Sequence, residues 1–196
     1  MKINIYAQHW LCHSLGLSKA FDRVDHGKML QKLSSEFIFL STLCSHIKPY
    51  ISSRRQFVSF KHRRSHIRHV RSGVGHGSVL GPLLCSVYLN NFFSVVESTV
   101  YALADDIQSL FYGTQSRDAL QLFIHESLDQ LERWMKSNSM LLNISKSKIM
   151  RFGTMHLRDM RFQLRGNELE FVDKLKMLNV IIDRKFNCSH YIGDIC

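Results

Sequence analysis

Two adjacent aspartates, Asp105 and Asp106, stand between two apolar segments in the middle of the chain. The approach, residues 100–104, reads Val-Tyr-Ala-Leu-Ala, and the exit, residues 107–112, is also largely apolar. Short apolar runs on both sides of a polar dipeptide predict a β-hairpin, or a pair of short strands, with the acids at the turn. Because neighbouring carboxylates repel each other, this turn is either well solvated or occupied by a divalent cation, for which Mg²⁺ is well suited.

The composition places the chain among ordinary globular proteins. It has 196 residues, of which 45% are hydrophobic, enough for one domain with a real core. No apolar run approaches the roughly 20 residues of a membrane span, and the first ten residues lack a signal-peptide layout. The five cysteines are scattered without a C-x-x-C pair, which argues against a disulfide framework or a zinc ribbon. We therefore expect an intracellular protein, nuclear or cytoplasmic, with no membrane segment.

The positive charge is concentrated in one part of the chain. The formal net charge is +10, and residues 37–96 contain no aspartate or glutamate. Aromatic residues at 50, 57 and 60 lie between the basic ones, a combination typical of a nucleic-acid-binding face, although a merely solvated face would also fit. The basic residues that we expect to contact nucleic acid are Arg54, Arg55, Lys61, Arg63, Arg64, Arg68 and Arg71.

The apolar spacing predicts alternating helices and strands, and hence an α+β sheet with helices on one face. Residues 26–47 have helical spacing, ended by Pro49, and 79–93 form a buried helix. An amphipathic helix over 118–136 has apolar positions at 120, 124, 128, 131 and 135. Short strands are expected at 56–60, 67–70, 149–152 and 178–182, and a hairpin over 161–172 turns at Gly166-Asn167.

Four segments in one order carry a family resemblance. They are 17–26 (LSKAFDRVDH), 72–84 (SGVGHGSVLGPLL), 104–106 (ADD) and 142–148 (LNISKSK). Together they closely resemble the palm of reverse transcriptases from non-LTR (LINE-type) retrotransposons, nearest the jockey-like elements. Segments 50–58 and 176–183 are similar to that family's stretch between its first two motifs and to its primer-grip strand. The likeness covers nearly the whole chain.

The resemblance implies a fold and an activity. The fold would be a reverse-transcriptase palm: an antiparallel sheet with helices on one face. The activity would be RNA-directed DNA polymerisation on an RNA template with a DNA primer and deoxynucleoside triphosphates. Two Mg²⁺ ions would act at Asp105 and Asp106. Residues 1–196 would be a single partial domain, with motifs over 16–183. Fingers and thumb would be largely missing, as in a truncated, decayed copy. Residues 1–13 do not resemble the apolar strand that the family has there.

One departure from the family pattern affects the metal site. The first motif normally begins with an aspartate that binds metal, and Gly16 stands in its place. Asp22 matches the last aspartate of that motif and lies past the expected strand end, so we do not expect it to replace the ligand. Losing a charged metal ligand should slow the reaction by on the order of 10³-fold or worse. We therefore expect this copy to be inactive or weakly active.

The resemblance assigns further site residues. Phe21 would contact the incoming sugar, His76 stands where the family has glutamine, and Leu103 stands where it usually has tyrosine. The residues implied to bind the nucleotide are Phe21, His76, Gly77, Lys146 and Lys148. Gly73 and Ser78 would lie against the template strand. Without the resemblance, Phe21 could be a core residue and the lysines ordinary surface residues.

Three other functions remain open at this point. A non-catalytic nucleic-acid-binding remnant would use the basic stretch and would bind in a salt-dependent manner without metal. A structural or protein-interaction fragment would show neither behaviour. The aspartate pair alone would also suit a metal-dependent hydrolase, but no other motif supports that function.

Overall fold

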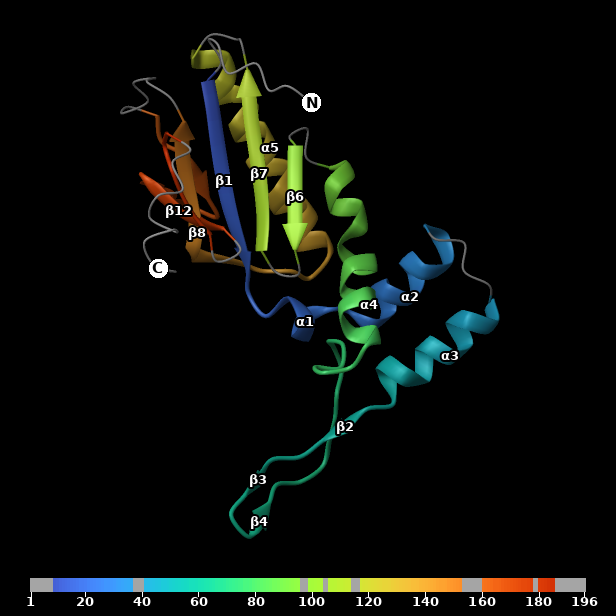
Figure 1. Ribbon diagram of the computed structural model, residues 1–196. Coiled ribbons are helices and arrows are strands. Elements are labelled where there is room, and N and C mark those ends of the chain that lie inside the picture. The colour runs from blue at the N-terminus through green and yellow to red at the C-terminus, as the bar shows by residue number, and fades with distance from the viewer. Residues whose placement is uncertain are drawn as a thin grey trace. The chain divides into compact units, whose positions relative to one another are not determined.

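The computed structural model describes residues 9–36, 41–95, 99–103, 106–113, 117–152, 160–177 and 180–185 (Figure 1). The chain divides into two compact units. Unit 1 comprises residues 1–18, 92–135 and 142–196, and unit 2 comprises residues 19–91 and 136–141. Strands and helices are mixed along the chain, which confirms the predicted α+β class.

Unit 1 is built on a five-stranded sheet with the order β11-β8-β1-β7-β6. Its strands are β1 (His9–Leu17), β6 (Thr99–Leu103), β7 (Asp106–Gly113), β8 (Leu142–Phe152) and β11 (Glu170–Val172). The central strand β1 pairs antiparallel with both β7 and β8, whereas β11 runs parallel to β8. The predicted hairpin is confirmed, because β6 and β7 pair antiparallel with Leu103 opposite Asp106.

The central strand begins earlier than the sequence suggested. Residues 9–13 belong to β1, so the expectation that this stretch lacks the family's strand was wrong. A central strand is covered on both faces and therefore need not alternate apolar and polar residues. In β1 even His13 is buried, with 2% of its surface exposed. The polar His13, which weakened the strand pattern in the sequence, therefore lies inside the protein.

A helix covers one face of this sheet. In Figure 1, helix α5 (Arg117–Ser137) runs along the sheet behind β1 and β7. Its five predicted apolar positions, Leu120, Ile124, Leu128, Leu131 and Met135, are all buried, which confirms the predicted amphipathic helix. Phe92 and Trp134, in the same unit, pack edge to face with ring centroids 5.1 Å apart.

The other face of the sheet is covered by a two-stranded ribbon. Strands β12 (Lys174–Met177) and β13 (Val180–Asp183) pair antiparallel. Leu175 of this ribbon joins Cys12, Met150 and Phe152 of the sheet in one buried cluster. Burial raises the pKa of the Cys12 thiol to about 11, so the thiol stays neutral and inert.

The predicted hairpin over 161–172 is only partly correct. Strands β9 (Gln163–Leu164) and β10 (Asn167–Glu168) pair across Arg165-Gly166, not across Gly166-Asn167. Both turn residues have positive φ, 54° and 72°, as a type I′ turn requires. The hairpin is short because residues 170–172 leave it and pair with β8 in the main sheet.

His13 makes the stability of unit 1 dependent on pH. Its Nε2 is buried without a hydrogen-bond partner among the described residues, and burial lowers its pKa from 6.5 to about 3. Below pH 6.5 the His13 imidazole binds a proton in the unfolded chain but not in the folded chain. The free energy of unfolding therefore falls as the pH falls. We expect the unfolding free energy to drop by about 1.4 kcal/mol between about pH 7.5 and about pH 5.5.

Urea unfolding at the two pH values measures this drop. The His13→Leu variant should lose that part of the pH dependence. It should also be more stable than the natural chain at the higher pH, because an unpaired buried nitrogen is replaced by an apolar side chain. An identical pH dependence in both proteins would contradict the assignment to His13.

Unit 2 contains the remaining helices. They are α1 (Ala20–Arg23), α2 (His26–Ser35), α3 (Ser41–Ser52) and α4 (Leu80–Leu89). The 3₁₀ turn η1 (Asn90–Ser94) follows α4 and continues into unit 1 from Phe92 onward. The predicted 26–47 helix is two helices, and Pro49 lies inside α3 instead of ending it. Pro49 is in the last turn, and its carbonyl still accepts the amide of Ser53 at 3.0 Å, so the helix closes normally. None of the helices in the described ranges is long and apolar enough to cross a bilayer.

A lysine joins α2 to α4. The Lys32 ammonium donates hydrogen bonds to the Tyr88 carbonyl and the Asn91 side chain, both at 2.6 Å. It also lies 4.8 Å from the centroid of the Tyr88 ring. Burial lowers the pKa of Lys32 and raises that of Tyr88 to about 12. These contacts fix the helix that begins at the glycine-rich turn.

The basic segment forms a two-stranded arm, residues 54–71. Two short ladders build it, β2 (Arg55–Gln56) with β5 (Arg68–His69), and β3 (Ser59–Phe60) with β4 (Arg63–Arg64). This agrees with the predicted strand pair joined by a basic turn. Figure 1 shows the arm as a narrow ribbon that extends away from the helices of unit 2.

Candidate active site and nucleic-acid interface

The sheet of unit 1 brings Gly16 and Asp106 together. Gly16 on β1 pairs with Asp106 on β7 and with Asn143 on β8. Position 16 is therefore the direct neighbour of Asp106 on the adjacent strand. Asp105 and the side chain of Asp106 lie outside the described part of the chain.

Gly16 also has a packing partner that the sequence did not reveal. The β1–β8 register shifts between Ser14 and Gly16, and Lys146 of β8 comes close to the glycine. A Cβ at position 16 would lie 2.8 Å from the Lys146 Cβ and 3.2 Å from its Cδ. The stem of Lys146 therefore occupies the space that a side chain at position 16 needs.

The two lysines of the fourth motif differ in their contacts. Lys148 pairs with Glu170 of the neighbouring strand β11. Lys146 is exposed and makes no hydrogen bond or ion pair within the described residues. Of the two, Lys146 is the one whose ammonium remains available to an anionic ligand.

The oxygen donors of the hairpin fit a divalent cation, but not a complete three-carboxylate site. Two neighbouring carboxylates are the hard ligands that Mg²⁺ prefers, whereas glycine at position 16 adds no side-chain oxygen. Within the described ranges, no three His, Cys, Asp or Glu side chains gather into a metal-binding group.

Unit 2 contains a pocket of about 420 Å³ between the first motif and the glycine-rich turn. Helix α1 contributes Phe21, and the start of α4 contributes Pro82. The complete lining is Phe21, Gly75, His76, Gly77, Ser78, Val79 and Pro82. Three residues assigned to the nucleotide from the sequence, Phe21, His76 and Gly77, therefore lie around one pocket.

An aspartate–histidine pair stands at this pocket. The Nε2 of His76 lies 2.7 Å from Oδ1 of Asp22, and both side chains are exposed. The His76 ring centroid is 5.8 Å from that of Phe21. When Asp22 is ionised, its carboxylate accepts a hydrogen bond from Nε2–H of His76, which leaves Nδ1 of the neutral ring as an acceptor. Nothing in the sequence indicates this pair, because the two residues are 54 positions apart.

Ser78 holds the glycine-rich turn together. Its hydroxyl accepts from the Tyr50 hydroxyl at 2.7 Å and from the Gly81 amide at 3.0 Å, and donates to the Gly75 carbonyl at 2.8 Å. These bonds occupy the hydroxyl of Ser78, whose backbone we expected from the sequence to lie against the template strand. Ser78 therefore shapes the wall of the pocket, a role that sequence reasoning missed.

Gly73 joins the turn to the first motif. Its φ is +87°, and its amide donates to the Val24 carbonyl at 2.7 Å. The Gly73 carbonyl oxygen lies 2.9 Å from Nε2 of His26. Arg54 also donates to that carbonyl, so this arginine anchors the root of the arm. The other six cations assigned to nucleic acid, at 55, 61, 63, 64, 68 and 71, are exposed.

Comparison with known proteins gives a consistent result. The family model described as reverse transcriptase (RNA-dependent DNA polymerase) matches residues 2–190. The chain is 31% identical to the RNA-directed DNA polymerase from the mobile element jockey of Drosophila funebris, over 92% of this chain and 20% of that protein. It is 28% identical to the probable RNA-directed DNA polymerase from transposon X-element of Drosophila melanogaster, over 98% of this chain and 22% of that protein. The chain thus spans about one fifth of the length of these relatives.

The fold is also found among solved structures. Apo telomerase from Candida tropicalis, truncated from its C-terminal domain, matches with a TM-score of 0.64 at 12% identity, over 89% of this chain and 34% of that one. Telomerase from the same organism, in complex with a TWJ fragment of telomeric RNA, matches with a TM-score of 0.62 at 12% identity, over 93% and 30%. The expected palm fold and the resemblance to non-LTR elements are confirmed. Since the family model covers nearly the whole sequence, this chain belongs to the reverse transcriptase (RNA-dependent DNA polymerase) family.

Proposed function

We propose that this chain is the palm segment of a retrotransposon's RNA-directed DNA polymerase. It would act on an RNA template with a DNA primer and deoxynucleoside triphosphates. The pairing of Asp106 with Leu103 in the hairpin and with position 16 on β1 carries this proposal. Asp105 and Asp106 would hold Mg²⁺. When bound, the metal supplies charge that activates the primer hydroxyl and neutralises the triphosphate leaving group.

The pocket in unit 2 supports a nucleotide as the ligand. Its volume of about 420 Å³ falls within the range of small-molecule sites. Phe21 offers an apolar ring for the sugar, and His76, held by Asp22, offers Nδ1 as an acceptor. Lys146 would neutralise the pyrophosphate, since Lys148 is paired with Glu170.

The activity of this copy would be low. Position 16 supplies no oxygen to the metal, and loss of one charged group at such a site costs about 10²–10³-fold in rate. We therefore place this chain among weakly active or inactive polymerases, with the binding steps better preserved than the chemical step.

Mn²⁺ binding tests the assignment of the aspartate pair without relying on turnover. The Asp105→Asn and Asp106→Asn variants should each bind Mn²⁺ at least about tenfold more weakly than the natural chain, because each loses one anionic ligand. Asp118→Asn, at the exposed start of α5, is the matched control and should bind as the natural chain does. The free Mn²⁺ signal in electron paramagnetic resonance reports the affinity, and equal affinities in all four proteins would refute the proposed metal ligands.

The second candidate function is nucleic-acid binding without catalysis. The exposed cations of the arm favour it, because they need neither a metal nor an intact active site. Binding of a labelled RNA in the presence of EDTA, weakened by added salt, would support this function whatever the outcome of a primer-extension assay.

A further inference from the structure

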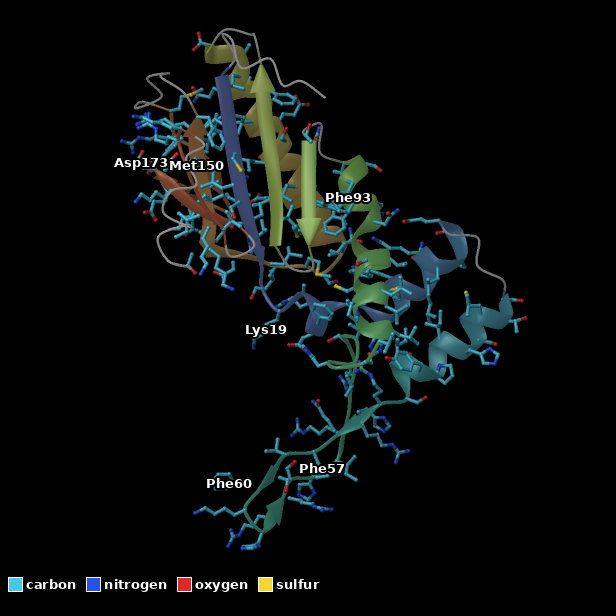
Figure 2. All side chains as sticks on the ribbon, in the orientation of Figure 1. Lys19, Phe57, Phe60, Phe93, Met150 and Asp173 are labelled. Carbon is cyan, nitrogen blue, oxygen red and sulfur yellow. The ribbon has the colours of Figure 1, made fainter. Side chains whose placement is uncertain are left out.

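The arm exposes apolar side chains that a soluble surface normally hides. A two-stranded ribbon has two faces and nothing of its own to bury them. Four large apolar residues are therefore accessible: Phe57 at 47%, Val58 at 70%, Phe60 at 71% and Ile67 at 64%. Figure 2 shows Phe57 and Phe60 on the arm, among side chains that end in nitrogen. Two of the four are aromatic rings on a strongly basic ribbon.

Each ring has a cation beside it. The Arg64 guanidinium carbon lies 5.2 Å from the centroid of Phe57, and the Lys61 ammonium lies 5.6 Å from that of Phe60. The ladder places Arg64 opposite Ser59 and Arg63 opposite Phe60. Phe57 lies two residues before Ser59, so by strand alternation Phe57 and Arg64 belong to one face and Phe60 and Arg63 to the other. Both faces of the ribbon thus combine a ring with positive charge.

The positive charge of the arm would by itself bind any polyanion, but the exposed rings of Phe57 and Phe60 restrict the class of nucleic acid that fits. In a duplex the flat faces of the bases are stacked on one another and only their edges are open to a protein. In a single strand the bases can turn outward and stack on an aromatic side chain, while cations follow the phosphates. Exposed phenylalanines next to arginine and lysine are the groups that such a single strand needs.

We propose that the arm, residues 54–71, binds single-stranded nucleic acid by stacking bases on Phe57 and Phe60, independently of the metal site. The inference rests on the proposed nucleic-acid-binding function and adds the form of the ligand and the residues that select it. Arg63, Arg64 and Lys61 contact the phosphates on either side of a stacked base. RNA and DNA single strands share this chemistry, and the experiment separates them.

Fluorescence anisotropy with the full chain in EDTA tests the proposal. The probes are a labelled oligo(U), a labelled oligo(dT) and a labelled DNA duplex of matched length, each measured over a series of salt concentrations. Phe57→Leu combined with Phe60→Leu removes both rings and keeps apolar bulk. We expect it to weaken single-strand binding by about 10-fold or more and to leave duplex binding and the salt dependence unchanged. Loss confined to oligo(U) or to oligo(dT) also supports stacking and identifies the natural strand.

Two further variants separate stacking from charge. Arg63→Gln combined with Arg64→Gln should weaken both single-strand and duplex binding. It should also reduce the slope of log affinity against log salt on single strands by about 1.4, about 0.7 for each lost contact. Val58→Ala combined with Ile67→Ala alters exposed apolar residues of the same arm and should bind as the natural chain does. Since all these side chains are exposed, unchanged thermal unfolding confirms that each variant folds.

Several outcomes overturn the proposal. Unchanged single-strand binding in the double phenylalanine variant would refute stacking. Equal losses for single strands and duplex would show that the rings do not distinguish them. If the natural chain binds none of the three probes, both this inference and the nucleic-acid-binding function are refuted. Failure of primer extension with intact, ring-dependent binding would leave the inference standing and would refute only retained catalysis.

Discussion

Gly16→Asp combined with Lys146→Gly should raise primer extension over the natural chain, but by less than the roughly 10²–10³-fold expected of a restored charged group, because the second change also removes the ammonium that we assign to the pyrophosphate. The aspartate adds a carboxylate at position 16, which pairs directly with Asp106 on the neighbouring strand. It needs the second change because a Cβ at position 16 would lie 2.8 Å from the Cβ of Lys146, which even alanine at 146 would retain. Glycine on β8 removes that atom. Extension of oligo(dT) on poly(A) RNA with Mg²⁺ or Mn²⁺ measures the gain.

The single variants give the controls for this prediction. Gly16→Asp alone should be less active than the double variant and less stable than the natural chain by about 1–3 kcal/mol, the usual cost of overpacking. Lys146→Gly alone should stay inactive. Adding Asp105→Asn to the double variant should abolish the gain.

Mn²⁺ affinity provides a second measurement that does not depend on catalytic turnover. It should rise in the double variant even where extension stays undetectable, because the new carboxylate adds a ligand. Unchanged Mn²⁺ affinity would show that position 16 is not part of the metal site. Full activity in Gly16→Asp alone would show that Lys146 moves aside at little cost.

Gly73→Ala should destabilise the protein by about 3 kcal/mol or more, the largest effect on stability that we expect from one methyl group. Its φ of +87° is unfavourable for alanine, which costs on the order of 1–3 kcal/mol. The new Cβ would also lie 2.8 Å from the Asp22 Cα and from the Phe21 carbonyl oxygen. Both are backbone atoms of the first motif and cannot rotate away, so the turn and the motif must separate.

Gly77→Ala is the matched control, because it adds the same methyl group in the same turn. Its φ is +74°, but a Cβ there meets nothing within 4 Å. It should therefore lose only about 1–2 kcal/mol, the cost of the left-handed backbone. Urea unfolding of the two variants isolates the cost of the close contact, and equal losses would contradict it.

The elements that could be predicted from the sequence are those set by local patterns. The apolar spacing of 118–136 identified α5, because five positions on one helical face must be buried together. The apolar runs around the aspartates identified the β6–β7 hairpin, and the order of the motifs identified the family. Each of these signals lies within a short stretch of residues, or in the sequence of such stretches.

Only the tertiary structure determined how distant residues meet. It placed His9–Leu17 at the centre of the sheet with His13 buried, although that stretch has no alternating pattern. It paired Lys148 with Glu170 and His76 with Asp22, and it brought the stem of Lys146 against Gly16. From the sequence we interpreted Gly16 as a lost metal ligand. In the sheet, its lack of a side chain also lets β8 approach β1 closely. The physical reason is that strand pairing and side-chain contacts depend on neighbours in space, which residue spacing along the chain does not encode.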